Sequence, residues 1–320
     1  MKKVLSAILM VAALLLCFSG CSDGTEPVSG PVRVGALRGP TAMGMAKLMT
    51  DGQENYEFTL GADAAALVAP LTKGELDIAA IPANLAATLY NNTDGAVKLV
   101  AINTLNVLYI VERGDTIRSV SDLAGRTLYA TGEAAVPEYV LRYVLEQNGL
   151  TGDKAPLIRW CSDTTEVLAR LEAEEHAAAM LPQPFVSAAQ MKVEGLRRAL
   201  DLGSEWKKLS PDAEIITGVL AVRTEFAEKH PDELAAFLEE YKASVSFVTQ
   251  NTDAAAELIG ELEIVKAPIA KKALPSCGIS YIDGSDMESK VGGFLRILYE
   301  SDAKSVGGKL PDSGFYYERP

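Results

Sequence analysis

Short apolar runs alternate with amphipathic helical patterns along the first third of the chain. The apolar runs lie at residues 32–37, 56–60, 77–81 and 97–102. Helical patterns occupy the intervals 40–49, 64–73 and 84–90. Short apolar runs bounded by turn residues are typical of strands that are covered on both faces. The alternation therefore predicts an α/β fold with a mainly parallel sheet and helices on both of its faces.

The same order of elements recurs further along the chain. Apolar runs follow at 126–130, 157–160, 177–181 and 196–202, and helical patterns at 137–147, 164–174 and 185–191. Segment 71–84, LTKGELDIAAIPAN, has a degraded copy at 171–184, LEAEEHAAAMLPQP. The shared positions are Leu71, Glu75, Ala79 and Pro82, which recur as Leu171, Glu175, Ala179 and Pro182. Two lobes of similar construction are predicted, although a chance match between alanine-rich segments is the alternative.

Two apolar runs, at 107–112 and 218–222, break this alternation. The first follows strand 97–102 after only four residues, which is too short for a crossover between parallel strands. We therefore expect the chain to leave lobe one near 104–106 and to return near 216–218, so that two segments form a hinge. Lobe one would comprise 32–105 and 218–320, and lobe two 106–217.

The N-terminus reads as an export signal. Lys2 and Lys3 precede an apolar segment at 5–18, and Ser19 and Gly20 come directly before Cys21. This order predicts a signal peptide at 1–20. Small residues before a cysteine resemble the processing site of bacterial lipoproteins, in which Cys21 would carry the lipid. Residues 21–31, which lack apolar periodicity, are expected to form a tether.

Composition narrows the class of partner. The formal charge of the 320-residue chain is −13, or −15 once the two lysines of the signal peptide are removed, and this does not favour nucleic acid. Two cysteines, Cys161 and Cys277, remain after residue 21. Two cysteines in a long exported chain do not make a disulfide framework. They could pair only if the fold brings them together, and we favour two free thiols.

A search for catalytic chemistry is mostly negative. The chain contains no nucleophile elbow, zinc-protease helix motif or phosphate-binding loop. Its two histidines, His176 and His230, stand at predicted helix ends, where they have structural roles. We therefore expect no catalytic residue, no cofactor and no metal site.

Polar residues instead gather in the loops that follow the predicted strands. Ligands of open α/β sheets lie beyond the carboxyl ends of the strands. Asn84 could instead cap its helix, Trp160 could belong to the core, and Arg38 could be a solvated surface residue. The candidate ligand-binding residues are Arg38, Thr41, Asn84, Thr104, Asn106, Thr131, Gly132, Trp160, Ser162 and Gln183.

Three short segments add a family resemblance. GELDIA at 74–79, SVSDLAGR at 119–126 and GVLAVRTEF at 218–226, together with the lipoprotein site at Cys21, resemble type II substrate-binding proteins of ABC importers. Within these the chain is similar to the branch that binds sulfonates, nitrate, taurine and thiamine precursors. The resemblance implies a monomeric, lipid-anchored receptor on the outer face of the bacterial cytoplasmic membrane. It would close on a small molecule about its hinge and deliver it to a membrane permease with a separate ATPase.

The resemblance leaves the ligand open. Members of this branch often carry a Glu-Pro-aromatic segment where this chain has Gln183, Pro184 and Phe185, so a cationic ligand that relies on the acid does not carry over. The resemblance to the sulfonate and nitrate binders implies an anion that is held at positions like Thr41, Asn84 and Thr131. Arg38 favours an anionic group, Trp160 a planar one and Glu133 an amine. A sensor lipoprotein and an enzyme related to thiamine-pyrimidine synthesis are the alternative functions.

Overall fold

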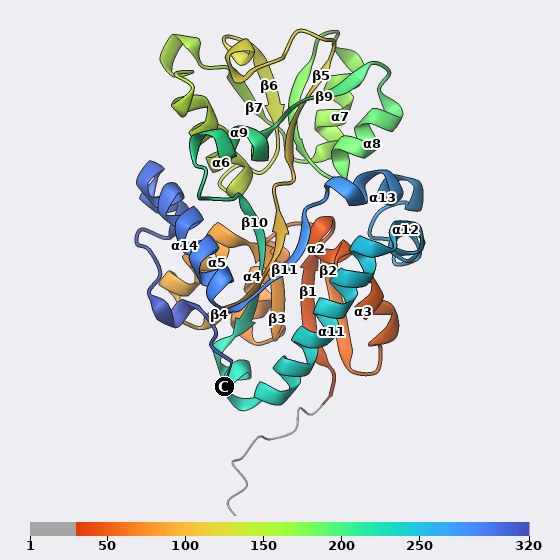
Figure 1. Cartoon of the computed structure of the whole chain (residues 1–320), viewed down its shortest axis with the longest axis vertical. Helices are drawn as coiled ribbons and strands as arrows, with labels where there is room; N and C mark the ends of the chain where they lie inside the picture. The colour runs from red at the N-terminus through yellow and green to blue at the C-terminus, as the bar shows by residue number, and fades with distance from the viewer. Residues whose placement is uncertain (1–29, 320) are drawn as a thin grey trace, which may run out of the picture.

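The structure is a computed structural model that describes residues 30–319 and comprises two lobes, one above the other in Figure 1. The predicted signal peptide, the lipidation site at Cys21 and nearly all of the tether lie outside the described residues. Each lobe is built on one sheet with helices packed against it (Figure 1). We call the lower lobe, which contains the first strand of the chain, lobe one, and the upper lobe lobe two.

The sheet of lobe one has six strands in the order β11-β4-β10-β3-β1-β2. Strand β1 runs parallel to both β2 and β3, whereas β10 is antiparallel to β3 and β4, and β11 is antiparallel to β4. The strand bounds are β1 (Val32–Leu37), β2 (Tyr56–Gly61), β3 (Ile78–Pro82), β4 (Val97–Leu105), β10 (Ile216–Arg223) and β11 (Ile279–Ile282).

The sheet of lobe two has five strands in the order β7-β6-β8-β5-β9. Strand β6 is parallel to β7 and β8, and β5 is antiparallel to β8 and β9. The strand bounds are β5 (Leu108–Arg113), β6 (Thr127–Ala130), β7 (Leu157–Trp160), β8 (Ala178–Pro182) and β9 (Leu196–Asp201).

The two sheets share one topology, which confirms the predicted two-lobed α/β fold. Five strands of lobe one, β2-β1-β3-β10-β4, correspond in order to β7-β6-β8-β5-β9 of lobe two. In each sheet four strands run in one direction, as expected, and the sheet is mixed because the remaining strands run antiparallel to them. In each lobe the strand that arrives from the other lobe, β10 or β5, inserts antiparallel between two strands that would otherwise be neighbours.

The duplicated segments occupy equivalent places. In both lobes a helix leads into a strand, β3 or β8, whose first four residues are buried and whose last residue is a proline. Another helix follows. The left-handed Gly74 ends the first of these helices, as its position in the sequence predicts. The repeat thus marks two equivalent strand-to-helix connections, one in each lobe.

Helices surround both sheets (Figure 1). Those of lobe one are α2 (Pro40–Met43), α3 (Ala46–Asp51), α4 (Ala65–Lys73), α5 (Ala83–Asn92), α10 (Thr224–Lys229), α11 (Pro231–Gln250), α12 (Thr252–Glu261), α13 (Ala267–Ala273) and α14 (Gly284–Ser301). Those of lobe two are α6 (Val136–Gln147), α7 (Thr164–Ala173), α8 (Phe185–Lys192) and α9 (Leu202–Leu209).

One predicted helix, at 40–49, is divided into α2 and α3. The buried Ser244 of α11 explains the break, because its hydroxyl oxygen lies 2.9 Å from the carbonyl oxygen of Gly44 and accepts the amide of Leu48 at 3.1 Å. This serine satisfies backbone groups that a continuous helix would have paired internally.

The chain crosses between the sheets where the sequence predicts a hinge. The first crossing runs from β4 to β5 through Asn106, which has a left-handed backbone, and the second enters β10 after Ile215. The two crossings are hydrogen-bonded, since the amide of Asn106 donates to the carbonyl of Ile215 at 3.2 Å. A third segment joins them, because the amide of Leu105 donates to the carbonyl of Gly278 at 2.8 Å.

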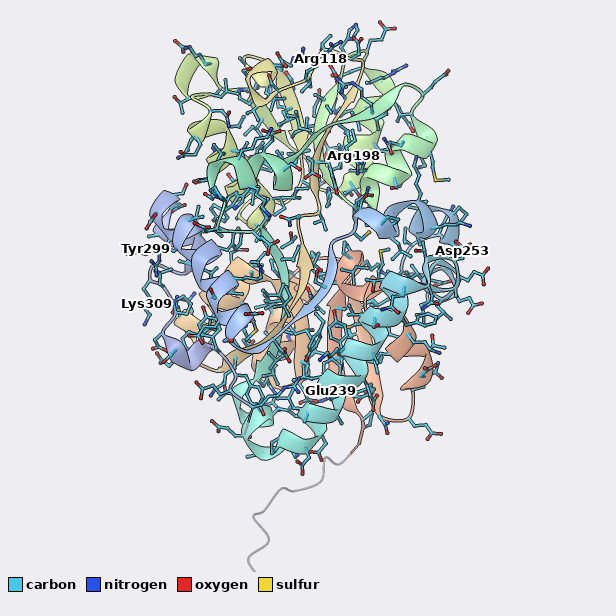
Figure 2. The ribbon with its side chains drawn as sticks, viewed as in Figure 1. Arg118, Arg198, Glu239, Asp253, Tyr299 and Lys309 are labelled. Atoms are coloured by element: carbon cyan, nitrogen blue, oxygen red, sulfur yellow. The ribbon has the colours of Figure 1, made fainter. Side chains whose placement is uncertain are left out.

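Side chains also connect the lobes beyond the hinge. Trp206 of α9 packs against Phe294 of α14 with 5.6 Å between ring centroids. Near the hinge, Tyr109 and Arg198 of lobe two donate hydrogen bonds to the carbonyl and the hydroxyl of Ser276, each at 3.2 Å. Figure 2 shows Arg198 in the lower part of the upper lobe. The described structure is therefore a form in which the lobes touch.

The two described cysteines are unpaired, as favoured from the sequence, and we predict that they differ in reactivity. Cys277 is fully buried, which raises the pKa of its thiol to about 12, whereas Cys161 is partly exposed. In a chain that begins at Ser22, Cys161 should react with a thiol reagent under native conditions and Cys277 only after unfolding. A Cys161→Ser variant should lose the native reaction. Equal labelling rates at both sites would contradict the prediction.

Candidate functional site

A cavity of about 250 Å³ lies between the lobes, and residues of both lobes line it. We call it the inner cavity. Lobe two contributes the start of α6 and the end of β8, where Pro182 and Gln183 lie. The lobes approach closely beside the cavity. A Cβ added to Gly39 of lobe one would lie 3.9 Å from Cδ of Pro184 in lobe two. The lobe-one residues that line the inner cavity include Leu37, Arg38, Pro40, Thr41, Thr104 and Thr217.

Two hydroxyl groups of the hinge strands lack a protein partner. Thr104 at the end of β4 is 1% exposed, and Thr217 lies in the neighbouring strand β10. Within residues 30–319 neither Oγ1 makes a hydrogen bond, although both side chains line the inner cavity. Buried hydroxyl groups almost always have a partner. These two unpartnered hydroxyl groups beside the cavity are therefore candidates to bind a polar group of a ligand.

Arg38 supplies the cation of the inner cavity. It follows β1, and its Nη1 donates to the carbonyl oxygen of Glu263, 2.7 Å away. A guanidinium has five N–H donors, so this bond fixes the side chain and leaves the other donors for a ligand. Among the described residues that line the inner cavity there is no aspartate or glutamate.

Gln183 is held from the lobe-two side. It is 3% exposed, and its Oε1 accepts the amide of Ser187 at 3.2 Å in the first turn of α8. With the oxygen occupied in this way, the amide nitrogen is the group left for a ligand. Gln183 therefore adds a donor, where the Glu-Pro-aromatic segment would have placed an acceptor.

Five of the ten candidate residues line the inner cavity, and five lie elsewhere. Asn84 is buried and donates to the carbonyl of Ser305 at 3.3 Å, and Asn106 accepts the amide of Ile215 at 3.3 Å. Ser162 is exposed, and its amide donates to Glu166 at 3.0 Å. Trp160 packs against the core, and Thr131 follows β6 outside the cavity lining. These five are not brought together with Arg38, Thr41, Thr104, Gly132 and Gln183.

The sequence did not single out two important lining residues, Thr217 and Phe185, as ligand contacts. Thr217 belongs to the predicted return crossing, but its strand was expected to begin at Gly218 and not at Ile216. The sequence identifies Phe185 only as the first residue of a predicted helix and as the aromatic residue of the family segment. The sequence does contain a signal for Thr217 and Phe185 as ligand contacts, because they lie at a strand end and a helix start, where ligands of α/β sheets bind.

Comparison with known proteins identifies the family. A family model described as NMT1/THI5-like matches residues 61–255, which is more than half of the chain. The chain belongs to the NMT1/THI5-like family. A search of curated proteins found no match.

Solved structures share the fold of this NMT1/THI5-like chain. An ABC transporter from Parabacteroides distasonis has a TM-score of 0.77 at 24% identity, over 91% of this chain and 100% of that one. The periplasmic aliphatic sulphonate binding protein SsuA from Escherichia coli has a TM-score of 0.72 at 15% identity, over 92% and 94%. The nitrate-binding protein NrtA from Synechocystis has a TM-score of 0.58 at 14% identity, over 81% and 74%. The fold is thus that of type II periplasmic binding proteins.

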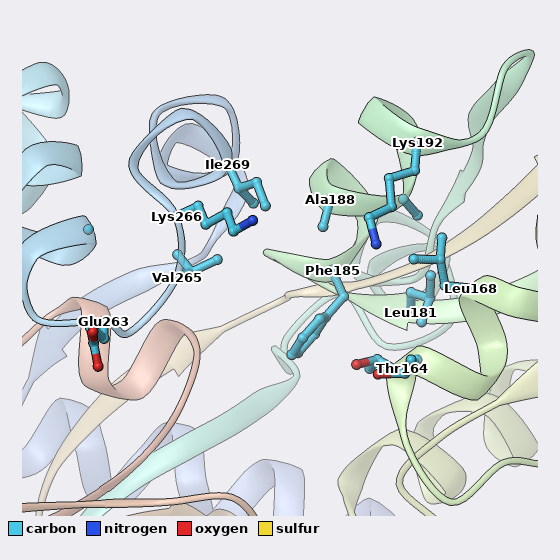
Figure 3. Close-up of a pocket in the computed structure, with 13 residues that line it drawn as sticks. Thr164, Leu168, Leu181, Phe185, Ala188, Lys192, Glu263, Val265, Lys266 and Ile269 are labelled. Carbon is cyan, nitrogen blue, oxygen red and sulfur yellow. The ribbon is translucent and has the colours of Figure 1, made fainter.

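A second and larger cavity of this NMT1/THI5-like chain lies between α7 and α8 of lobe two and the α12–α13 region of lobe one (Figure 3). We call it the outer cavity, and its volume is about 660 Å³. Phe185 lines both cavities, and Glu263, whose carbonyl holds Arg38, lines the outer one. Phe185 and the Arg38–Glu263 contact therefore connect the two cavities.

Two further properties concern metals and membranes. In the part of the chain that the structure describes, no cluster of three or more histidine, cysteine or acidic side chains could hold a metal ion. No helix within residues 30–319 combines the length and the apolar character needed to cross a bilayer.

Proposed function

We propose that this chain is the extracytoplasmic substrate-binding component of an ABC importer, anchored by a lipid on Cys21, and that it carries a small organic anion to a membrane permease. The family, the fold and the neighbours named for sulfonate and nitrate binding support this proposal. It is a carrier and not an enzyme. The signal peptide predicted at 1–20 and the absence of catalytic motifs in the sequence support this part.

The observation that carries the proposal is the set of unpartnered donors in the inner cavity. The hydroxyls of Thr104 and Thr217 lie on hinge strands of lobe one, and the amide of Gln183 belongs to lobe two. A ligand between them makes its full set of contacts only when the lobes are together. A ligand shifts a conformational equilibrium only through such differential contacts. Binding would therefore favour the closed form.

The charge of the inner cavity favours an anion. Arg38 is its cation, no acidic residue lines it within the described part of the chain, and the hydroxyls of Thr104 and Thr217 and the amide nitrogen of Gln183 can each donate to an anion. A carboxylate, sulfonate or similar oxyanion on a compact apolar body fits this lining. A cation would gain no counter-charge there.

The experiment is a thermal-shift titration of the chain beginning at Ser22 with small sulfonates and carboxylates, and with ammonium compounds of equal size. An anion that binds the folded state should raise the melting temperature, and the ammonium compounds should not. A Thr104→Val variant should bind the best anion about ten-fold more weakly or worse, because a hydrogen bond to a charged group is lost. Its stability without ligand should not fall, because the hydroxyl has no protein partner to lose.

The matched control is Thr249→Val on α11, whose hydroxyl donates to Val245 in its own helix at 2.8 Å. This variant should keep the full affinity for the anion. The proposal fails if no anion shifts the melting temperature, or if Thr104→Val binds as well as the parent. Uptake of the identified anion should also be lost from cells that lack this chain, and turnover of the anion by the purified protein would contradict the carrier role.

A further inference from the structure

The outer cavity has an apolar wall drawn from both lobes. Leu168, Leu181 and Phe185 belong to lobe two, and Val265 and Ile269 belong to lobe one. In Figure 3 these side chains face a common space between α8 and the start of α13. A volume of about 660 Å³ is large enough for an organic molecule of moderate size. The wall would contact the apolar body of such a molecule.

Two lysines extend into this space from opposite sides. Lys192 is the last residue of α8 in lobe two, and Lys266 directly precedes α13 in lobe one. Figure 3 shows both amino groups directed into the gap between the lobes. Glu263, the one acidic residue among the described residues that line this cavity, has its carboxylate directed away from them (Figure 3).

Neither lysine has a counter-ion within residues 30–319, although the chain has 43 acidic residues. The position of Lys266 at the start of a helix also gives it no favourable interaction with the helix dipole, which is positive at that end. Two like charges that converge from different lobes oppose closure unless an anion lies between them. The lysines that do form ion pairs with carboxylates include Lys47, Lys208, Lys229, Lys271 and Lys290.

We propose that the outer cavity is a second anion-binding subsite for an amphipathic organic molecule with a doubly charged oxyanion head, such as a phosphate monoester. The head lies between Lys192 and Lys266, and the apolar body lies against Phe185 and its neighbours. Because the lysines belong to different lobes, one anion neutralises both and draws the lobes together. The inference rests on the proposed function only in taking the cleft as a solute site.

The probe is phenyl phosphate, measured by isothermal titration calorimetry on the chain beginning at Ser22. We expect Lys192→Gln and Lys266→Gln each to weaken its binding by roughly three- to ten-fold, as for a partly exposed charge-assisted contact. Higher salt should weaken binding to the parent chain more than binding to either variant. Benzyl alcohol, which has the ring without the charge, should bind much more weakly.

The matched control is Lys271→Gln, since Lys271 lies on the same helix, α13, but pairs with Asp253 at 2.9 Å and does not line the cavity. Lys271→Gln and Thr104→Val should both keep the affinity for phenyl phosphate. The inference is overturned if phenyl phosphate does not bind, if benzyl alcohol binds equally well, or if neither lysine variant weakens binding. A loss with Thr104→Val alone would place phenyl phosphate in the inner cavity, which supports the proposed function and overturns this inference. Lysine-dependent binding without any response to small anions would support the subsite and contradict the proposed function.

Discussion

Replacing Asp77 with alanine should lower the free energy of unfolding by about 3 kcal/mol, because it removes the centre of a buried ion-pair cluster. Asp77 is 2% exposed, and its carboxylate accepts Nε and Nη2 of Arg33 at 2.9 and 2.7 Å and Nη2 of Arg223 at 3.2 Å. It also accepts the backbone amide of Arg33 at 3.0 Å. The cluster therefore joins β1, β3 and β10. The expected loss is at the low end for a broken buried pair, because both arginines keep some contact with water.

Urea denaturation of the variant at neutral pH measures this loss. The matched control is Asp51→Ala, which removes only an exposed pair with Lys47 and should change the unfolding free energy by less than about 0.5 kcal/mol. Equal effects of the two substitutions would show that the Asp77 cluster does not stabilise the fold.

The stability from Asp77 should depend on pH. Burial alone would raise the pKa of this carboxyl group, but the hydrogen bonds from Arg33 and Arg223 outweigh burial and hold its pKa below the usual value. A lowered folded-state pKa stabilises the protein above the unfolded pKa of about 4, and this contribution is lost as the pH falls through the folded pKa. The difference between the parent and Asp77→Ala should therefore shrink in acid.

Lobe two has an equivalent anchor in Glu112 at the end of β5. This carboxylate is fully buried and accepts the amides of Thr116 and Ile117 at 3.1 and 3.0 Å and Nη2 of Arg197 at 2.6 Å. Burial acts to raise its pKa, but the hydrogen bonds from the Thr116 hydroxyl and from the amides of Ile117 and Thr116, together with the Arg197 charge, lower it overall. In each lobe, one buried acidic residue, Asp77 directly before β3 or Glu112 within β5, thus holds separate elements of that lobe together.

Local patterns in the sequence predict the individual strands and helices of the fold. Strand β7 has the bounds predicted from its apolar run, and the copied segments at 71–84 and 171–184 form equivalent strand and helix units. Each of these elements depends on residues close together in the chain. The pairing of β10 between β3 and β4 depends on residues more than one hundred positions apart. For this reason the sequence does not predict the insertion of β10 between β3 and β4.

The candidate site was only half predictable for the same reason. The sequence identifies polar residues at strand ends, but it does not show which of them find protein partners. Asn84 sits after β3, as expected for a ligand contact, yet its amide is used by the carbonyl of Ser305 in the C-terminal segment. The hydroxyl of Thr104, in contrast, has no protein hydrogen-bond partner, and Thr104 lines the inner cavity. Asn84 and Ser305 are 221 positions apart in the sequence, so no local pattern encodes the contact that makes the difference.

Replacing Gly278 with alanine should destabilise the protein by about 4 kcal/mol or more, because the added methyl group has no space. Gly278 has a φ of 56°, and a Cβ there would lie 1.6 Å from the carbonyl oxygen of Leu105. Leu105 is the last residue of β4, directly before the crossing to lobe two, and its own amide donates to the carbonyl of Gly278. The backbones must separate to admit alanine, which breaks this hydrogen bond at the hinge.

The matched control for Gly278→Ala is Gly125→Ala, because it separates the steric clash from the cost of the backbone conformation. Gly125 has a φ of 66°, but a Cβ at this position would have no other atom of the described residues within 4 Å outside its immediate chain neighbours. It should therefore lose only the roughly 1–2 kcal/mol of a left-handed alanine. Urea denaturation of both variants gives the comparison. A loss at Gly278 no greater than that at Gly125 would mean that the three hinge segments can move apart at little cost, so the close contact between Leu105 and Gly278 would not hold the hinge.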